Sequence, residues 1–241
     1  MSRIVRSGSR IWLPAAVMLA CAAAIAGEVT VSPAEGPEQA GMVEIRALAP
    51  DIVLDIRCAG SDNFTGRPVP GYEAGKCYLL RPVAEALARV QQALRTQGYS
   101  LQVFDCYRPV RAVQAFVAWI DEADDPAARQ RYYPRLAKSE LLGGGYIAAT
   151  SGHSRGATVD LGLLDCRSGR CVALDMGTGF DHFDPLAHTD AAGIDARQRG
   201  NRQRLLQAMA AQGFANYPQE WWHYTLKPEP DPLTAYGFPV R

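Results

Sequence analysis

Two short segments of this 241-residue chain hold the side chains that could do chemistry. One reads SGHSRGATVD and contains His153 and Asp160; the other reads EWWH and contains Glu220 and His223. Together they offer two imidazoles, a carboxylate that could complete a metal site, and a second carboxylate beside it. A catalytic zinc uses three protein ligands, an open position for water and a general base nearby. The pattern therefore predicts a zinc site held by His153, Asp160 and His223, with Glu220 as the base.

The immediate neighbours of these residues support this interpretation. Asp160 lies between Val159 and Leu161, and a carboxylate in an apolar strand is costly to bury unless it is paired or bound to metal. A salt-bridged aspartate is the competing interpretation for Asp160. The two tryptophans after Glu220 would exclude water and raise the pKa of its carboxyl toward the range of a working base. Taken alone, Glu220 and His223 could be a surface glutamate near a core histidine.

Two further residues could act on a substrate. Arg108 follows a short strand and precedes Pro109, which stiffens the turn, so its guanidinium could stabilise an oxyanion that develops at the metal. Asp181 lies in a glycine-interrupted acidic loop and could hold a substrate ammonium. The plainer interpretations are a solvent-exposed arginine and ordinary turn chemistry. His182 and His188, near Asp181, are expected to be structural or surface histidines.

Composition and charge exclude several classes of function. The 25 basic and 25 acidic residues cancel to a formal net charge of zero. The chain thus lacks the basic surface of a nucleic-acid-binding protein, and we expect no nucleic-acid partner. Nothing in the charge balance favours attraction to an anionic membrane.

The first 26 residues have the features of a signal peptide. Three arginines precede an uncharged, mostly apolar stretch over Ile11–Ile25, and small residues precede Gly27. The apolar stretch is shorter than the roughly 20 residues that a transmembrane helix needs. We expect residues 1–26 to be removed on export to the periplasm, with no stable membrane insertion afterwards. Acylation at Cys21, as in a lipoprotein, is the minor alternative.

Export would make disulfides available. Cys166 and Cys171 flank a polar turn between two apolar runs, and facing positions of a hairpin are close enough for a disulfide. Cleavage of the signal peptide leaves five cysteines, so at least one should remain a thiol. For a second bridge the expectation is Cys58 with Cys77.

The remaining chain predicts one mixed domain. Residues 27–41 are rich in Pro, Gly, Glu and Ala and are expected to form a linker, and residues 42–241 the domain. Ser61–Gly75 is expected to be a long loop. The patterns predict helices beginning at Pro82, over Val110–Ile120 and over Asn201–Gln212, and strands within Val43–Ile56, Leu101–Phe104, Ala157–Leu164, Cys171–Leu174 and His223–Leu226. Arg129–Leu142 gives no clear pattern. The fold class is α+β with a central antiparallel sheet flanked by helices.

These segments together resemble the D-alanyl-D-alanine dipeptidases, the VanX-like branch of the M15 zinc peptidases. The similarity extends over nearly the whole mature chain. A His and an Asp separated by six residues, with a later E-x-W-H, mark the wider superfamily, which has the M15/hedgehog-like fold. The segments DNFTG at 62–66 and YRPVRA at 107–112 narrow the similarity to dipeptidases.

The resemblance implies a zinc-dependent enzyme that hydrolyses D-Ala-D-Ala, with one Zn²⁺ per chain on the three predicted ligands. It implies that Glu220 activates the attacking water and passes its proton to the leaving amine, and that Arg108 stabilises the oxyanion. It places Asp181 at the amino group of the dipeptide, Ser151 in the same pocket, and Tyr72 in a loop that reaches the substrate. Relatives of the antibiotic-resistance type act inside the cell. An exported enzyme fits breakdown or recycling of cell-wall dipeptides better.

Two other functions remain open from the sequence. A D,D- or L,D-carboxypeptidase of the same superfamily would trim longer peptidoglycan peptides, but Asp181 as an ammonium anchor suits a free dipeptide. A non-catalytic zinc-binding module, as in the hedgehog signalling domain, is disfavoured by the presence of both Glu220 and Arg108.

Overall fold

The structure, a computed structural model, describes Met1 and residues 27–241. The expected signal peptide and Cys21 fall within residues 2–26, outside the described part. Within 27–241, no helix is long and apolar enough to cross a membrane.

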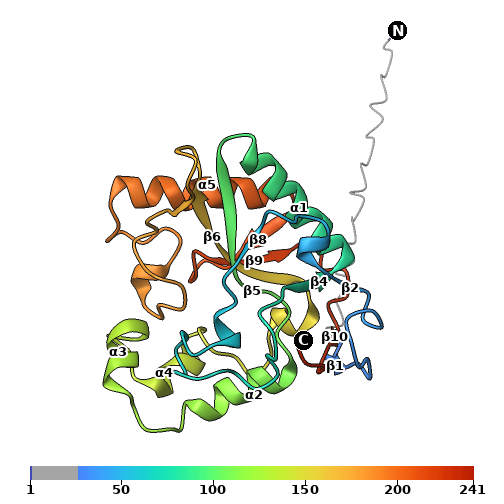
Figure 1. Cartoon of the computed structure of the whole chain (residues 1–241), viewed down its shortest axis with the longest axis vertical. Helices are drawn as coiled ribbons and strands as arrows, with labels where there is room; N and C mark the ends of the chain where they lie inside the picture. Colours follow the sequence, from blue (N-terminus) through green and yellow to red (C-terminus); the bar gives the residue numbers. More distant parts are fainter. Residues whose placement is uncertain (2–26) are drawn as a thin grey trace.

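A six-stranded sheet forms the centre of the domain (Figure 1). Along it the strands follow the order β3 (Val53–Leu54), β5 (Tyr99–Asp105), β6 (Thr158–Asp165), β9 (His223–Leu226) and β8 (Phe214–Asn216), while β7 (Val172–Ala173) pairs with the far end of β6. All pairs are antiparallel except β3 with β5. The mixed α+β fold with a mainly antiparallel sheet is as predicted, with one parallel pair added at the edge.

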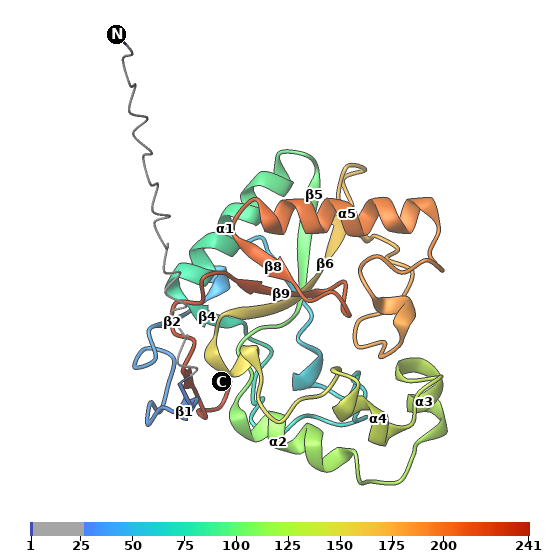
Figure 2. The same cartoon turned by 180° about the vertical axis from the view of Figure 1, so that it is seen from behind.

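The helices form two groups around this sheet (Figures 1 and 2). α1 (Arg81–Arg95) and α5 (Ala196–Ala210) pack together and against the sheet, α1 on β5 and α5 on β6 and β8. α2 (Val110–Trp119), α3 (Pro126–Tyr132) and α4 (Lys138–Gly143) form the second group, at the other end of the molecule. Nearly all residues of β5 and β6 are buried, in agreement with their apolar sequence.

Two small sheets join distant parts of the chain. β2 (Met42–Glu44) pairs antiparallel with β4 (Tyr78–Leu80). β1 (Thr30–Val31) pairs in parallel with β10 (Thr234–Ala235), so the segment expected as a linker contributes a short strand. Four 3-10 turns complete the elements: Ile45–Ala47, Arg57–Ala59, Gly152–Arg155 and Pro185–Ala187.

Local sequence signals explain where the helices begin and end. α1 has Pro82 in its first turn, buries its apolar stripe, and is followed by Gly98 at φ 78°, a left-handed position that glycine adopts without strain. α5 begins at Ala196, earlier than the predicted Asn201. Asp195 and Gln198 form a capping box there, which the apolar pattern alone does not show. The segment without a clear pattern, Arg129–Leu142, overlaps the end of α3 and most of α4.

The cysteines pair partly as expected. The Cys166–Cys171 disulfide closes the turn between β6 and β7, confirming that prediction. The expected Cys58–Cys77 bridge is wrong: Cys77 pairs with Cys106, and Cys58 is a buried thiol. Cys77 directly precedes β4 and Cys106 directly follows β5, and the hydrogen bond from Tyr107 N to Tyr78 O (3.0 Å) holds these strand ends together. The cross-strand contact decided the pairing, and no spacing in the sequence indicates it.

Candidate metal centre and active site

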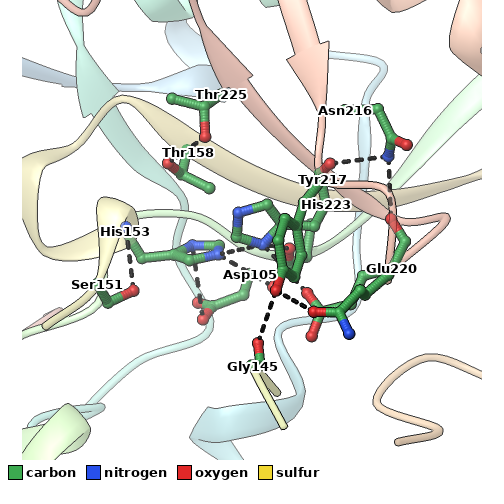
Figure 3. Close-up of polar contacts among 12 residues, drawn as sticks. Asp105, Gly145, Ser151, His153, Thr158, Asn216, Tyr217, Glu220, His223 and Thr225 are labelled. Carbon is green, nitrogen blue, oxygen red and sulfur yellow. Dashed lines mark hydrogen bonds and ion pairs between the residues drawn. The ribbon is translucent and has the colours of Figure 1, made fainter. Parts of the chain in front are cut away.

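The three predicted metal ligands converge in one place, and Figure 3 shows the two histidine rings next to each other. His153 Nε2 lies 3.2 Å from Asp160 Oδ2 and 3.4 Å from His223 Nδ1, and His223 Nδ1 lies 3.1 Å from Asp160 Oδ1. A tetrahedral zinc with bonds of 2.0–2.1 Å keeps its ligand atoms about 3.3 Å apart. Despite its short distance to His223, the buried Oδ1 of Asp160 makes no hydrogen bond within the described structure. Ligand atoms at this spacing, with one buried carboxylate oxygen left without a hydrogen bond, fit a shared cation.

The sheet fixes two of the three ligands. Asp160 of β6 and His223 of β9 are directly opposite each other in the strand register. His153 comes from outside the sheet, in the 3-10 turn Gly152–Arg155, where the side chain of Ser151 accepts a hydrogen bond from the His153 backbone N–H at 3.2 Å. This turn ends at Gly156 with φ 69°, a conformation that turns the chain back into β6.

Hydrogen bonding orients one imidazole for metal binding, and burial affects the charge of the other. His153 Nδ1 lies 2.7 Å from the carbonyl oxygen of Cys106, which can only accept, so Nδ1 donates there and Nε2 faces Asp160 and His223. Burial lowers the pKa of His223 and favours its neutral form. Burial alone would raise the pKa of Asp160, but the two histidines lower it, so its carboxylate is ionised.

Glu220 is adjacent to this group. Its Oε2 lies 3.4 Å from His223 Nδ1, and the side chain is almost fully buried beside Trp221 and Trp222. Burial, together with the charges of Asp160 and Asp181, raises the pKa of Glu220 well above its usual value. The predicted rise in this pKa is confirmed, with neighbouring carboxylates as an additional cause.

Arg108 lies at the same centre and is held by a residue that the sequence analysis gave no role. The fully buried Asp105 accepts from Arg108 Nε at 2.9 Å and pairs with Nη2 at 2.8 Å. Arg108 Nη2 also lies 3.5 Å from Asp160 Oδ2, and the guanidinium lies 5.0 Å above the Phe116 ring. An exposed arginine is thereby excluded. Asp105 ends an apolar strand, and this signal, the same one that singled out Asp160, could have identified it.

Asp181 is an unusual residue of the pocket. It is buried, it has a positive φ of 57°, and within the described chain its carboxylate forms no hydrogen bond or ion pair. Burial first, and the charge of Asp160 second, raise the pKa of Asp181. A strained backbone and an unpaired buried carboxylate are both destabilising, and such features concentrate at functional sites.

Ser151 and Tyr72 occupy different positions. Ser151 lines the pocket with Arg108 and Asp181. Tyr72 is not among the lining residues; its hydroxyl donates a 2.6 Å hydrogen bond to Asp105 and so reaches the centre only through that carboxylate. His182 and His188 lie at Arg131 O and the Tyr146 hydroxyl, away from the three metal ligands.

The pocket has a volume of ≈330 Å³. Besides the polar residues already described it is lined by Thr150, and its larger apolar residues are Phe64, Val113, Phe116, Ile147, Phe183 and Trp222. Tyr146 and Tyr217 also line it and were not predicted. The Tyr217 hydroxyl donates to Gly145 O at 3.1 Å, which joins the loop after α4 to the Glu220 segment (Figure 3). These tyrosines lie in loops with no periodic pattern, so sequence spacing gives no signal for them.

The chain is similar to several known proteins. The chain is 44% identical over 193 residues to a D-alanyl-D-alanine dipeptidase of Streptomyces coelicolor, covering 80% of this chain and 95% of that protein. It is 40% identical over 187 residues to a D-alanyl-D-alanine dipeptidase of Enterococcus faecium, covering 78% and 92%. Among solved structures, a vancomycin-resistance D,D-pentapeptidase in complex with Zn(II) is similar at 19% identity and a TM-score of 0.38, covering 66% of this chain and 77% of that one.

A family comparison covers most of the described chain. The family described as D-Ala-D-Ala dipeptidase, within the M15 peptidases, matches residues 38–240. This range contains every element from β2 onward and all of the site residues. The chain therefore belongs to the D-Ala-D-Ala dipeptidase family of M15 peptidases.

Proposed function

We propose that this chain is a zinc-dependent dipeptidase that hydrolyses D-Ala-D-Ala to two molecules of D-alanine. One observation carries the choice of a dipeptide: the unpaired, buried carboxylate of Asp181 lines the same ≈330 Å³ pocket as the three ligands and Glu220. A free ammonium is the partner that this carboxylate lacks. A substrate that binds Asp181 through its amino group must also place its peptide bond at the metal ligands. Such a substrate is short. The similarity to dipeptidases supports the same substrate.

The metal would be held by His153, Asp160 and His223, one ion per chain. Zinc at such a site supplies a Lewis acid that polarises a carbonyl and lowers the pKa of water. Glu220, whose pKa is raised, takes up a proton from the attacking water and delivers it to the nitrogen of the leaving D-alanine. Arg108 stabilises the negative charge that develops on the former carbonyl oxygen. Because Asp105 holds its guanidinium at two nitrogens, Arg108 needs no rearrangement as that charge appears.

Substrate binding would use Asp181 for the ammonium and Ser151 along the pocket wall. Tyr72 would act indirectly, since its hydroxyl fixes one oxygen of Asp105 while the other oxygen holds Arg108. The partner is a small D,D-dipeptide, and the neutral charge balance gives no reason to expect a nucleic acid.

The experiment that tests this function compares substrate lengths. The zinc-loaded protein is incubated with D-Ala-D-Ala and with a pentapeptide ending in D-Ala-D-Ala, and released D-alanine is measured. We expect release from the dipeptide and little from the pentapeptide. Faster release from the pentapeptide would make the protein a carboxypeptidase. Zinc binding without release from either peptide would make it a binding module.

We also propose that residues 1–26 direct export and that the enzyme works in the periplasm on dipeptides derived from the cell wall. The two disulfides at Cys77–Cys106 and Cys166–Cys171 support an oxidising compartment. Fractionation of cells that express the full chain tests this: we expect the mature protein, without residues 1–26, in the periplasmic fraction. Retention in the membrane fraction through Cys21 would favour the lipoprotein alternative.

A further inference from the structure

We propose that the Cys77–Cys106 disulfide is a positioning element of the metal centre, which holds the ligand His153 in its metal-binding orientation. The inference rests on the proposed zinc function. It concerns the affinity of the metal site, which can be measured without any substrate.

The first step is the contact between the disulfide and the ligand. The backbone carbonyl oxygen of Cys106 accepts a hydrogen bond from His153 Nδ1 at 2.7 Å. Such outer partners set the tautomer and ring orientation of a metal-binding histidine. The carbonyl group that orients His153 therefore belongs to a residue that forms a disulfide.

The second step is that His153 needs this support more than the other ligands do. Asp160 and His223 face each other on neighbouring strands, and the hydrogen bonds of the sheet fix their positions. His153 lies in a short 3-10 turn outside the sheet. Its ring is oriented through the Cys106 carbonyl, so motion of that carbonyl would move Nε2 relative to the two fixed ligands.

The third step is how Cys106 itself is held. It lies just after β5, where the ladder with β6 ends at Asp105. The disulfide links it to Cys77, next to β4, and the hydrogen bond from Tyr107 N to Tyr78 O lies beside this link. Both cysteines are fully buried. Without the covalent link, single hydrogen bonds would have to hold the turn that carries both the Cys106 carbonyl and Arg108.

The second disulfide provides a matched control. Cys166–Cys171 closes the hairpin at the far end of β6, roughly 20 Å along the strand from Asp160. The test compares zinc affinity, by competition with a fluorescent chelator, in Cys77→Ala/Cys106→Ala, in Cys166→Ala/Cys171→Ala and in the wild type. Changing an outer partner of a metal ligand typically weakens affinity 10–100-fold. The disulfide acts on this carbonyl only indirectly, through the backbone of Cys106, so we expect a loss at the lower end, about ten-fold, and none in the hairpin variant.

A second readout separates positioning from general stabilisation. His153→Ala is introduced with and without the Cys77–Cys106 pair. If the disulfide acts through His153, this substitution should lower zinc affinity less in the protein that lacks the disulfide. Equal losses in both backgrounds would overturn the proposal, as would unchanged zinc affinity without the disulfide or an equal loss in the hairpin variant.

A measurement on the wild type covers the case in which the variant does not fold. Coupling between two sites is reciprocal, so a disulfide that raises zinc affinity about ten-fold must become about ten-fold harder to reduce when zinc is bound. Reduction of each disulfide is followed in glutathione buffers with zinc-free and zinc-loaded protein. We expect zinc to protect Cys77–Cys106 and not Cys166–Cys171. Equal protection of both, or of neither, would overturn the proposal. A wild type that binds no zinc at all would instead refute the proposed function.

Discussion

Replacement of Asp181 by asparagine tests the proposed recognition of the substrate ammonium. Asparagine is the appropriate change because residue 181 has φ 57°, a left-handed conformation that asparagine tolerates better than alanine does. The volume and backbone stay the same, and only the charge is lost. The matching change in the substrate is N-acetylation of D-Ala-D-Ala, which removes the positive charge of the amino group.

The structure sets the size of the expected effect. The carboxylate of Asp181 is buried and, among the described residues, forms no hydrogen bond or ion pair, so the substrate ammonium would be its only direct partner. Breaking a buried ion pair by removing one partner costs about 3–5 kcal/mol. At 1.36 kcal/mol per factor of ten, this is a loss of roughly 10²–10³-fold or more in kcat/KM.

The assay measures kcat/KM for both enzymes with both substrates, as a double-mutant cycle across the complex. The wild type should strongly prefer the free dipeptide, and Asp181→Asn should largely remove this preference by losing activity on the free dipeptide. If the wild type hydrolyses the acetylated dipeptide as fast as the free one, the dipeptidase proposal fails and a carboxypeptidase takes its place. If the variant loses activity equally on both substrates, Asp181 has a structural role instead.

The same substitution has an expected effect on stability. Burial raises the pKa of Asp181 above its unfolded value of 3.8, so its contribution to stability is fully present below that value and is lost as the pH rises through the folded pKa. At neutral pH, above the unfolded pKa, burial of this carboxyl therefore destabilises the zinc-free protein. Zinc-free Asp181→Asn should have a higher Tm than the wild type at pH 7, and a smaller advantage at pH 4. An advantage of the same size at both pH values would contradict this origin.

The remaining predictions concern the metal centre. Asp160→Ala removes one of three ligands and should abolish tight zinc binding, and stoichiometric zinc in the purified variant would contradict the ligand assignment. Glu220→Gln should keep zinc and the fold but lose about 10²–10⁴-fold in kcat, as expected for a general base; an unchanged kcat would remove Glu220 from the mechanism. Arg108→Ala should lower kcat by about 10²–10³-fold while raising KM less, because the charge that it stabilises develops only in the transition state. Steady-state kinetics on D-Ala-D-Ala distinguish this from a loss confined to KM.

The sequence identified the three candidate metal ligands, which the structure brings together, better than it identified the residues around them. Asp160 was identifiable because a carboxylate between apolar strand residues needs a partner, and the structure brings His153 and His223 to it. The alignment of Asp160 with His223 across two strands could not be predicted, because register depends on the whole sheet. The family resemblance supplied the expected roles of Arg108 and Asp181, which local spacing left open.

Features that depend on contacts between distant segments were missed or misassigned. Cys77 pairs with Cys106 because two strand ends meet, and Cys58 is buried elsewhere. Tyr72 was expected at the substrate, but its hydroxyl is taken by Asp105. In each case the side chain has several chemically plausible partners. A tertiary contact determines which partner it meets, and the local sequence gives no sign of that contact.

The last residues of the sequence pack against segments from the beginning of the domain. Val240 is fully buried and bridges to Tyr72, while β10 pairs with β1 near the beginning of the described domain. Glu220 and His223 also come from this last part of the sequence. Because such long-range contacts form only when both segments are available, the candidate metal site cannot assemble until the segment that carries Glu220 and His223 has been synthesised.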